Sequence, residues 1–274
     1  MSFQPDAVRA FEHAGWQRAA AHYGNSFAHA TAPFIARLLD AAAISRGRHV
    51  LDVACGPGYL AAAAARRGAT AQGLDFSAEM VAVARSTYPD LVVTEGDAEA
   101  LPYSDGTFDA VVSSFGVHHI PRPDVALAEC RRVLKPGARI AFTVWAAPEE
   151  NTAWSLVFDA IDRHGDRSAA KSPPPGGALN QTTHCVRLLE AAGFIESSAE
   201  IVRAEWLVPN ADAMISALSA GTVRMAALIS AQEPSALAAI AGDIDRHAER
   251  FRRGESLAIP IAAVLAHARK AANG

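Results

Sequence analysis

"LDVACGPGYLA" (51–61) is the most informative segment of this chain. A hydrophobic run that carries Asp52 passes through Gly56 and Gly58 into an alanine-rich segment. This pattern predicts a buried strand over 48–54, a tight turn and a helix over 60–67. Such a turn exposes backbone N–H groups at a helix N-terminus, where a ligand can approach without meeting a Cβ atom. Turns of this kind serve several nucleotide cofactors, so the stretch alone does not say which one.

The following residues alternate between strand and helix patterns. Further strands are expected over 70–76, 91–97, 108–116 and 138–145. Helices are expected after Ser77, which is a candidate N-cap, and over 124–134, where "KPG" (135–137) breaks the pattern. Strands and helices that alternate at this spacing predict a parallel sheet covered by helices on both faces.

The two ends of the chain are more helical. Helices are expected over 5–44, 153–164 and 182–192, a loop at "SPPPGG" (172–177), and strands over 197–208 and 256–270. Residues 210–253 are far more than a turn needs and have helical spacing, so they predict a lid over the carboxyl end of the sheet. The expected organisation is an N-terminal helical cover (1–45), a cofactor-binding core (46–208), a helical cap insertion (209–253) and a final core strand with the C-terminus (254–274).

Composition excludes several classes of protein. The 274 residues are half hydrophobic and carry a formal net charge of −4, which argues against a nucleic-acid partner. The three cysteines have no CxxC spacing, so a reducing, cytoplasmic location is expected rather than a disulfide framework or a zinc site. No signal-peptide pattern is recognised and no apolar run approaches the roughly 20 residues that cross a bilayer, so no stable membrane insertion is expected.

Two further acids follow the ends of expected strands. Asp75 lies 75 − 58 = 17 residues after Gly58, where an acid can accept hydrogen bonds from both ribose hydroxyls of an adenosine. Asp97 ends the third strand, where it could hold an adenine amino group. Ligands of such sheets bind at the carboxyl ends of the strands. A dinucleotide fingerprint would favour a third glycine where this chain has Ala61.

Four stretches in register carry a family resemblance: "LDVACGPGYLA", "GLDFSAEMVAVAR" (73–85), "GDAEALPYSDGTFDAVVSSFGVHHI" (96–120) and "ALAECRRVLKPGARIAFTVW" (126–145). Over roughly residues 48–145 the chain resembles class I S-adenosylmethionine-dependent methyltransferases and is similar to their quinone-biosynthesis branch. The resemblance implies an α/β, Rossmann-like, doubly wound and mostly parallel seven-stranded sheet with an antiparallel last strand. The sequence departs from the family at Ala54, where glycine is usual.

The resemblance also implies a cofactor and its site. The cofactor would be S-adenosyl-L-methionine and the product S-adenosyl-L-homocysteine. This cofactor has no pyrophosphate, so the glycine turn would receive its amino-acid portion, with Asp52 ordering the ammonium group. The implied cofactor-binding residues are Tyr23, Asp52, Ala54, Gly56, Gly58, Asp75, Phe76, Met80, Asp97, Ala98 and Ser114.

The implied reaction is in-line transfer of a methyl group to an oxygen, carbon or nitrogen atom of a small, partly apolar metabolite. An oxygen or carbon acceptor usually has to lose a proton, and His118 and His119 are the candidate bases. Helix capping and packing in the pocket wall are the alternative roles for these histidines, and no metal site is expected. Candidate substrate-binding residues are Trp16, Phe115, His118, Trp145 and Arg224, with Thr222 in the lid and Trp206 and Phe251 as weaker candidates.

Two other functions stay open at this stage. An NAD(P)-dependent oxidoreductase would have a six-stranded, all-parallel sheet, and "GDAEALPY" followed by "LKPG" argues against it. A non-catalytic S-adenosylmethionine-binding protein would need the same acids, since binding without turnover uses the same contacts. The open acceptor classes are quinone precursors, polyketide-like phenols and lipid head groups.

Overall fold

The computed structural model describes residues 3–173 and 179–272 and is built around one sheet. The strand order is β3-β2-β1-β4-β5-β8-β6, and β7 pairs with β8 at one end. The strands are β1 (His49–Val53), β2 (Thr70–Asp75), β3 (Val92–Glu95), β4 (Phe108–Ser114), β5 (Leu134–Trp145), β6 (Ile195–Val208), β7 (Arg252–Arg253) and β8 (Ser256–Arg269).

Strand direction confirms the predicted sheet. β1 runs parallel to β2 and β4, β2 to β3 and β4 to β5, whereas β8 is antiparallel to both β5 and β6. The antiparallel β8 differs from the all-parallel sheet expected of an NAD(P)-dependent oxidoreductase. The two-residue β7 is an addition that the sequence pattern did not predict, because a pair this short has no periodicity to read.

The start of β5 also differs from the prediction. The strand was expected from residue 138, but it begins at Leu134, directly after helix α6 (Pro123–Val133). Leu134 is buried and pairs with Phe108, and the register then shifts so that Ala110 pairs with Arg139. "KPG" therefore ends the helix as expected and forms an irregularity inside the strand, with Gly137 at φ +77.

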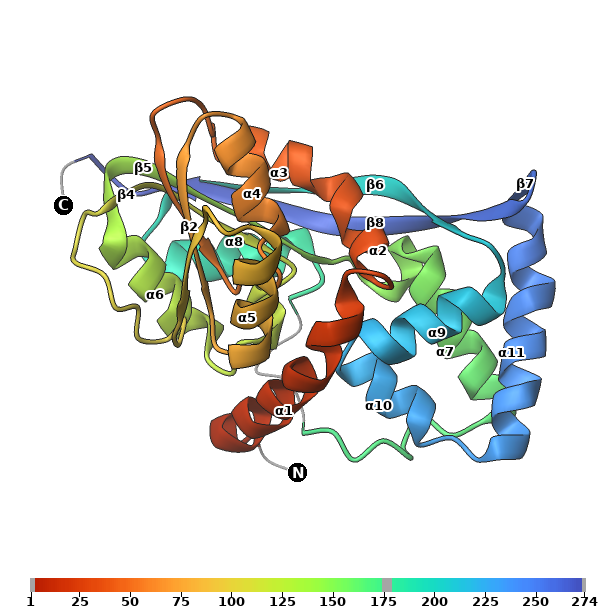
Figure 1. Ribbon diagram of the computed structural model, residues 1–274. Coiled ribbons are helices and arrows are strands. Elements are labelled where there is room, and N and C mark those ends of the chain that lie inside the picture. The colour runs from red at the N-terminus through yellow and green to blue at the C-terminus, as the bar shows by residue number, and fades with distance from the viewer. Residues whose placement is uncertain (1–2, 174–178, 273–274) are drawn as a thin grey trace.

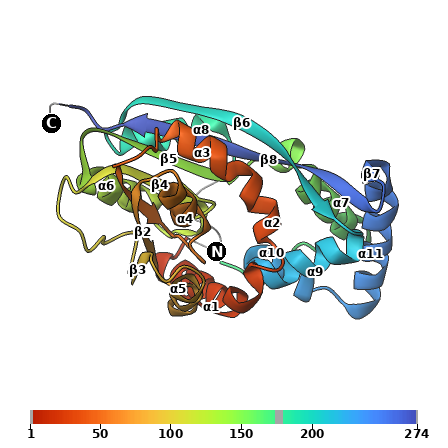
Figure 2. The same cartoon turned by 45° about the horizontal axis from the view of Figure 1, so that its top comes forward.

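Helices cover both faces of the parallel part of the sheet (Figures 1 and 2). One core lies between the sheet and α6 and α8 (Thr182–Ala191), and it includes Leu127 and Leu189. Another lies under α3 (Ile35–Ala41) and α4 (Tyr59–Arg66), and it includes Leu38 and Leu60. Helix α5 (Ala78–Thr87) begins at the predicted cap, since the Ser77 hydroxyl accepts a hydrogen bond from the Met80 N–H.

The strands β6 and β8 are long, 14 residues each, and reach beyond the parallel strands toward a second group of helices (Figure 1). These helices are α7 (Thr152–His164), α9 (Ala211–Gly221), α10 (Arg224–Ser230) and α11 (Pro234–Ala248). They share a core with the far ends of the two strands, in which Trp206, Met214 and Ile259 are almost fully buried. The predicted helical character of 210–253 is thus confirmed.

Helix α1 (Pro5–Tyr23) lies in front of the junction between the two groups of elements (Figures 1 and 2). It is followed by the short helices α2 (Ala28–Thr31) and η1 (Ala32–Phe34), which lead into α3. Most of the predicted loop 172–177 lies outside the described residues. No single helix in the described ranges could span a membrane by length and composition; the bent pair α9 and α10 passes that test together.

Candidate active site

The turn after β1 has a strained backbone. Ala54, Gly56 and Gly58 all have positive φ values, of 55°, 52° and 84°. Glycine adopts this conformation freely, whereas a residue with a Cβ atom pays about 1–2 kcal/mol. The surrounding structure therefore holds Ala54 in a backbone conformation that alanine disfavours. The family that the sequence resembles usually has glycine at this position. Strain of this kind persists where the surrounding structure fixes the backbone for a function.

Asp52 is a buried carboxylate with one free oxygen. Its Oδ2 atom accepts a hydrogen bond from the Ala61 N–H at 3.0 Å, in the first turn of α4. Its Oδ1 atom is buried and has no hydrogen-bond partner among the described residues. Burial raises the pKa of Asp52 well above its ordinary value, because the charged form has lost its water. A cation that donates to Oδ1 would stabilise the charged form.

Asp75 holds the turn together. Its Oδ2 atom accepts from the Gly56 N–H at 2.8 Å, and its Oδ1 atom accepts from the Ser77 N–H at 2.9 Å. Burial raises the pKa of Asp75 to about 6 in spite of these hydrogen bonds. The carboxylate therefore joins the glycine turn to the start of α5, a structural role that the sequence did not predict. Each oxygen keeps a second lone pair for a ligand hydroxyl.

Asp97 is paired with helix α1. Arg9 Nη1 lies 2.5 Å from Asp97 Oδ2, and Arg9 Nη2 lies 2.7 Å from Glu99 Oε2. Glu99 is also bound by Arg122, so it carries two arginine partners. Through these pairs α1 is tied to the loop after β3, which is where the adenine-binding acid was expected.

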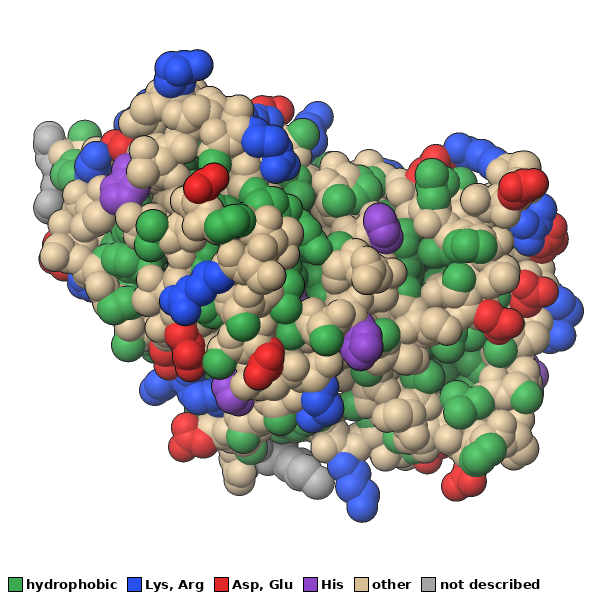
Figure 3. All heavy atoms as spheres, viewed as in Figure 1, with side chains coloured by type: hydrophobic (Ala, Val, Ile, Leu, Met, Phe, Trp, Pro, Cys, Tyr) green, Lys and Arg blue, Asp and Glu red, His purple; other side chains and the backbone are tan. Residues whose placement is uncertain are grey.

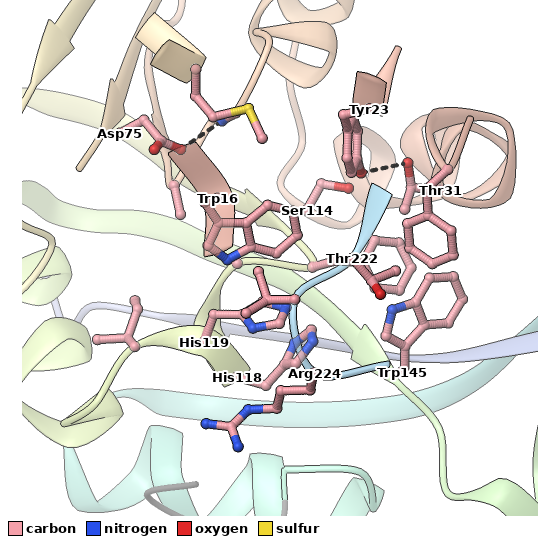
Figure 4. A pocket seen from close by; sticks show the side chains of 18 of the residues that line it. Trp16, Tyr23, Thr31, Asp75, Ser114, His118, His119, Trp145, Thr222 and Arg224 are labelled. Carbon is pink, nitrogen blue, oxygen red and sulfur yellow. Dashed lines mark hydrogen bonds between the residues drawn. The ribbon is translucent and has the colours of Figure 1, made fainter. Parts of the chain in front are cut away.

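A cavity of about 570 Å³ opens at the carboxyl ends of the strands. All of the predicted cofactor-binding residues line it except Gly58, which caps α4 instead. Asp75 lies at one end of this cavity, and Thr222 and Arg224 lie toward the other (Figure 4). Trp16 and Tyr23 reach it from α1, and Ser114 reaches it from the end of β4. The cavity is continuous, so a donor and an acceptor could occupy it together.

Aromatic rings form part of the cavity wall. Phe115 stacks on Trp145 with ring centres 4.1 Å apart, and Trp145 lies 4.7 Å from Trp154 of α7. Phe115 has φ +56, so the residue after β4 is strained like Ala54 after the neighbouring β1. Both strained residues line the cavity, which fits a functional rather than a folding reason for the strain.

Two of the weaker sequence candidates are wrong. Trp206 is 1% exposed within the core beneath the lid, and Phe251 packs against the same core from η4 (Glu249–Phe251). Neither residue lines the cavity. Large apolar side chains default to cores, and of these three residues only Trp145 was expected at the end of a strand on the ligand-binding edge of the sheet.

The histidine pair lies in η2 (Val117–His119), between Trp16 and Arg224 (Figure 4). Both histidines line the cavity. The two imidazole rings have centres 4.1 Å apart, and Trp16 packs edge-on against His119 at 4.9 Å. Burial, followed by the neighbouring His119 ring and the positive charge of Arg224, lowers the pKa of His118 well below its ordinary value. His118 is therefore neutral at physiological pH.

Sequence reasoning missed two charged residues on α1. Arg9 and Glu12 recur at helical spacing with the predicted Trp16 and face the cavity or its wall. A Glu on the apolar face of an amphipathic helix was the signal that could have found Glu12, because such residues are rarely buried without partners. Trp154, Phe158 and Arg167 also line the cavity and were not predicted.

Comparisons with known proteins agree with this geometry. Residues 51–142 match the family described as a methyltransferase domain. A demethylmenaquinone methyltransferase of Renibacterium salmoninarum is 40% identical over 111 residues, which are 40% of this chain and 47% of that protein. A 2-phytyl-1,4-naphtoquinone methyltransferase of a Synechocystis species is 40% identical over 115 residues, covering 38% of this chain and 48% of that protein. The chain thus spans about half the length of these curated relatives.

Among solved structures, the YcgJ protein of Bacillus subtilis has the same fold with a TM-score of 0.56 and 19% identity. The match covers 88% of this chain and 99% of that one. The family match falls on the strands and turns that carry Asp52, Asp75 and Asp97. Residues 51–142 therefore match a methyltransferase domain and resemble the curated methyltransferases, as the sequence resemblance implied.

Proposed function

We propose that the protein is an S-adenosyl-L-methionine-dependent methyltransferase that acts on a small, partly apolar metabolite. The observation that carries the proposal is the Asp52 carboxylate at the N-terminus of α4. A phosphate at this helix end would lie beside the Asp52 carboxylate, and two anions repel each other. The ammonium group of S-adenosyl-L-methionine would instead supply the cation that the free Oδ1 atom lacks.

The remaining cofactor contacts are those that the resemblance implies, and the lining of the cavity supports them. Asp75 would accept from the ribose hydroxyls, while Phe76 and Met80 would lie beside the adenine. Asp97 and Ala98 would hold the adenine edge, and Ser114 would lie near the sulfonium. When bound, the cofactor supplies an electrophilic methyl group, so the main task of the protein is alignment of donor and acceptor.

The acceptor side of the cavity belongs to the lid and to α1. We divide the chain into a helical cover (1–45), a core (46–208), a cap (209–253) and a final strand (254–274). Thr222, Arg224, Met225 and Leu228 from the cap line the cavity, which supports its role in selecting the acceptor. Trp16 and the rings around Trp145 favour an aromatic or otherwise apolar molecule.

A small-molecule acceptor also suits the surface. On the face shown in Figure 3, basic and acidic side chains are interspersed rather than gathered into a stripe of one sign. Polyanion binding usually needs such a stripe. A cytoplasmic location stays a prediction.

Isothermal titration calorimetry with S-adenosyl-L-homocysteine and with NAD tests the cofactor. We expect low- to mid-micromolar binding of S-adenosyl-L-homocysteine and no competition by NAD. Asp52→Asn should weaken binding by about 2 kcal/mol or more, because a charge-assisted hydrogen bond is lost. Asp109→Asn, at the other end of the sheet beside Lys135, is the matched control and should leave the affinity unchanged. Binding of NAD without S-adenosyl-L-homocysteine would contradict the proposal.

Methyl transfer itself is tested with isotopically labelled cofactor and pools of quinone precursors, phenols and lipid head groups. Labelled product separates an enzyme from a non-catalytic binding protein. Tight cofactor binding with no labelled product from any pool would favour the non-catalytic function.

A further inference from the structure

Glu12 is a buried carboxylate that the cofactor contacts do not use. It lies in the middle of α1 with its side chain fully buried. Its Oε2 atom is 2.9 Å from His119 Nδ1, and its Oε1 atom is 2.7 Å from Arg224 Nε. The three residues come from α1, from η2 and from the start of α10, so the cluster joins the helical cover, the core and the lid.

The carboxylate of Glu12 is ionised. Burial alone would raise its pKa, but the contact with His119 and the positive charge of Arg224 outweigh burial and lower it. A fully buried charge is costly unless it is paired, so this cluster needs both of its partners. Arg224 has a further contact besides Glu12, since its Nη1 atom donates to the Pro173 carbonyl at 2.8 Å.

The contact fixes which nitrogen of His119 is basic. An ionised carboxylate only accepts hydrogen bonds, so the hydrogen atom lies on Nδ1 and the lone pair of the neutral ring lies on Nε2. His119 lines the cavity with its side chain 16% exposed, whereas Glu12 lies behind it. His118 has no such carboxylate partner, and its buried Nδ1 atom is unpaired among the described residues. Of the two candidate bases, the geometry selects His119.

We infer that Glu12 is a positioning residue that holds His119 as the proton acceptor for a hydroxyl group on an aromatic methyl acceptor. This inference rests on the proposed function. The base argues against an amine, because a neutral amine attacks without one. Of the oxygen and carbon acceptors that need a base, an aromatic hydroxyl is the one that presents its proton directly to a neighbouring imidazole. The aromatic class follows from the rings of Trp16, Trp145 and Trp154 that line the same cavity.

The step balances with these groups alone. The acceptor oxygen forms a bond to the methyl carbon as the carbon–sulfur bond breaks, and that electron pair stays on sulfur. The hydroxyl proton moves to Nε2 of His119. The Glu12 carboxylate stabilises the resulting imidazolium until the proton passes to solvent.

The test compares phenols with matching aromatic amines. Wild type, Glu12→Gln and Glu99→Gln are first assayed for S-adenosyl-L-homocysteine binding. Methyl transfer from labelled S-adenosyl-L-methionine is then measured for a panel of one- and two-ring phenols and the corresponding amines. Glu99 is the matched control, because it also ties α1 to the core, through Arg9 and Arg122, but contacts neither histidine.

We expect Glu12→Gln to lower kcat for phenols by about 100-fold or more, the usual range for losing general base catalysis. The rate with amines should change by less than about threefold, and Glu12→Asp should recover part of the phenol rate. His119→Gln should reproduce the phenol-selective loss if Glu12→Gln does not fold, whereas His118→Gln should not. Glu99→Gln should leave the phenol-to-amine ratio as in wild type.

The contrary outcomes separate the two proposals. If wild type fails to bind S-adenosyl-L-homocysteine, the proposed function is wrong and this inference falls with it. If the cofactor binds but Glu12→Gln lowers phenol and amine rates equally, Glu12 only clamps the helices. If wild type binds the cofactor and methylates amines but no phenol, or neither class, the acceptor class is wrong.

Discussion

At the scale of single residues, Asp75 should make cofactor affinity depend on pH. Burial raises its pKa from an ordinary value of 3.8 to about 6. Burial thus favours the protonated carboxyl in the cofactor-free protein relative to the unfolded chain. The stability that this gives is fully present below the unfolded pKa and is lost as the pH rises through about 6. Ribose hydroxyls donate to the ionised form and offset that loss. We expect the affinity for S-adenosyl-L-homocysteine to rise about tenfold from pH 5 to pH 7, by calorimetry.

Substitutions at the same position separate the ribose contact from the structural one. Asp75→Ala should weaken cofactor binding by about 2–4 kcal/mol and also destabilise the apoprotein, since the Gly56 and Ser77 N–H groups lose their acceptor. Asp75→Asn keeps one acceptor oxygen, should do less harm and should flatten the pH dependence. An unchanged pH dependence in Asp75→Asn would assign it to another group.

Ala54 offers a test of backbone strain. Its φ of +55 costs about 1–2 kcal/mol, which glycine at this position would remove. Glycine also gives the unfolded chain more conformational freedom, but the stability lost in this way is smaller than the strain removed. We expect Ala54→Gly to raise Tm by about 2–4 °C. Ala54→Ser keeps the Cβ atom and is the control that should not stabilise. A lower Tm for Ala54→Gly would mean that the alanine methyl packs well enough to outweigh its strain.

At the scale of elements, the sequence predicted what periodicity encodes. The strands of the parallel sheet and the cap of α5 were found because buried runs and Ser77 have local signatures. The early start of β5 was missed because "KPG" is a strong breaker and only the pairing of Leu134 with Phe108 carries the strand past it. The Glu12 cluster was missed because its members lie more than 100 residues apart along the chain and share no motif.

The contact between α1 and the lid can be tested by a pair of substitutions. Gly15 of α1 faces Val223, so closely that a Cβ atom at Gly15 would lie 2.3 Å from Val223 Cγ1. Gly15→Ala should therefore cost about 1–3 kcal/mol of unfolding free energy by overpacking. Val223→Ala makes room, so the double variant should be more stable than the sum of the single effects, by about 0.5 kcal/mol or more in denaturant titrations. Additive effects would mean that the two helices adjust independently.

At the scale of the whole molecule, the cofactor half and the acceptor half of the cavity differ in how well the sequence predicts them. The family match covers residues 51–142, and the acids and glycines of the cofactor half lie within it. The acceptor half comes from α1, α7 and α10, where the pattern requires only apolar residues at helical spacing. Sequence reasoning therefore predicted that a lid exists, and it named Thr222 and Arg224, but it could not find the partner that Arg224 meets on α1.

Helix α1 contacts both the cofactor half and the acceptor half of the cavity, so cofactor binding should stabilise only the part of the lid that α1 contacts. α1 contacts the adenine-side acid through Arg9 and Asp97, the start of α5 through Gln17 and Ser77, and α10 through Glu12 and Arg224. By contrast α11 is fastened to α7, where Asp243 pairs with Arg163 away from the cavity.

We therefore expect S-adenosyl-L-homocysteine to slow amide hydrogen exchange in α1 and α10 and to leave α11 unchanged, as measured by mass spectrometry. Glu12→Gln removes the link from α1 to α10 but keeps the links of α1 to the cofactor half. In that variant the protection of α1 should persist while that of α10 is lost. Equal protection of α10 and α11 in wild type would show instead that the lid responds as one rigid body, with no special part for Arg224.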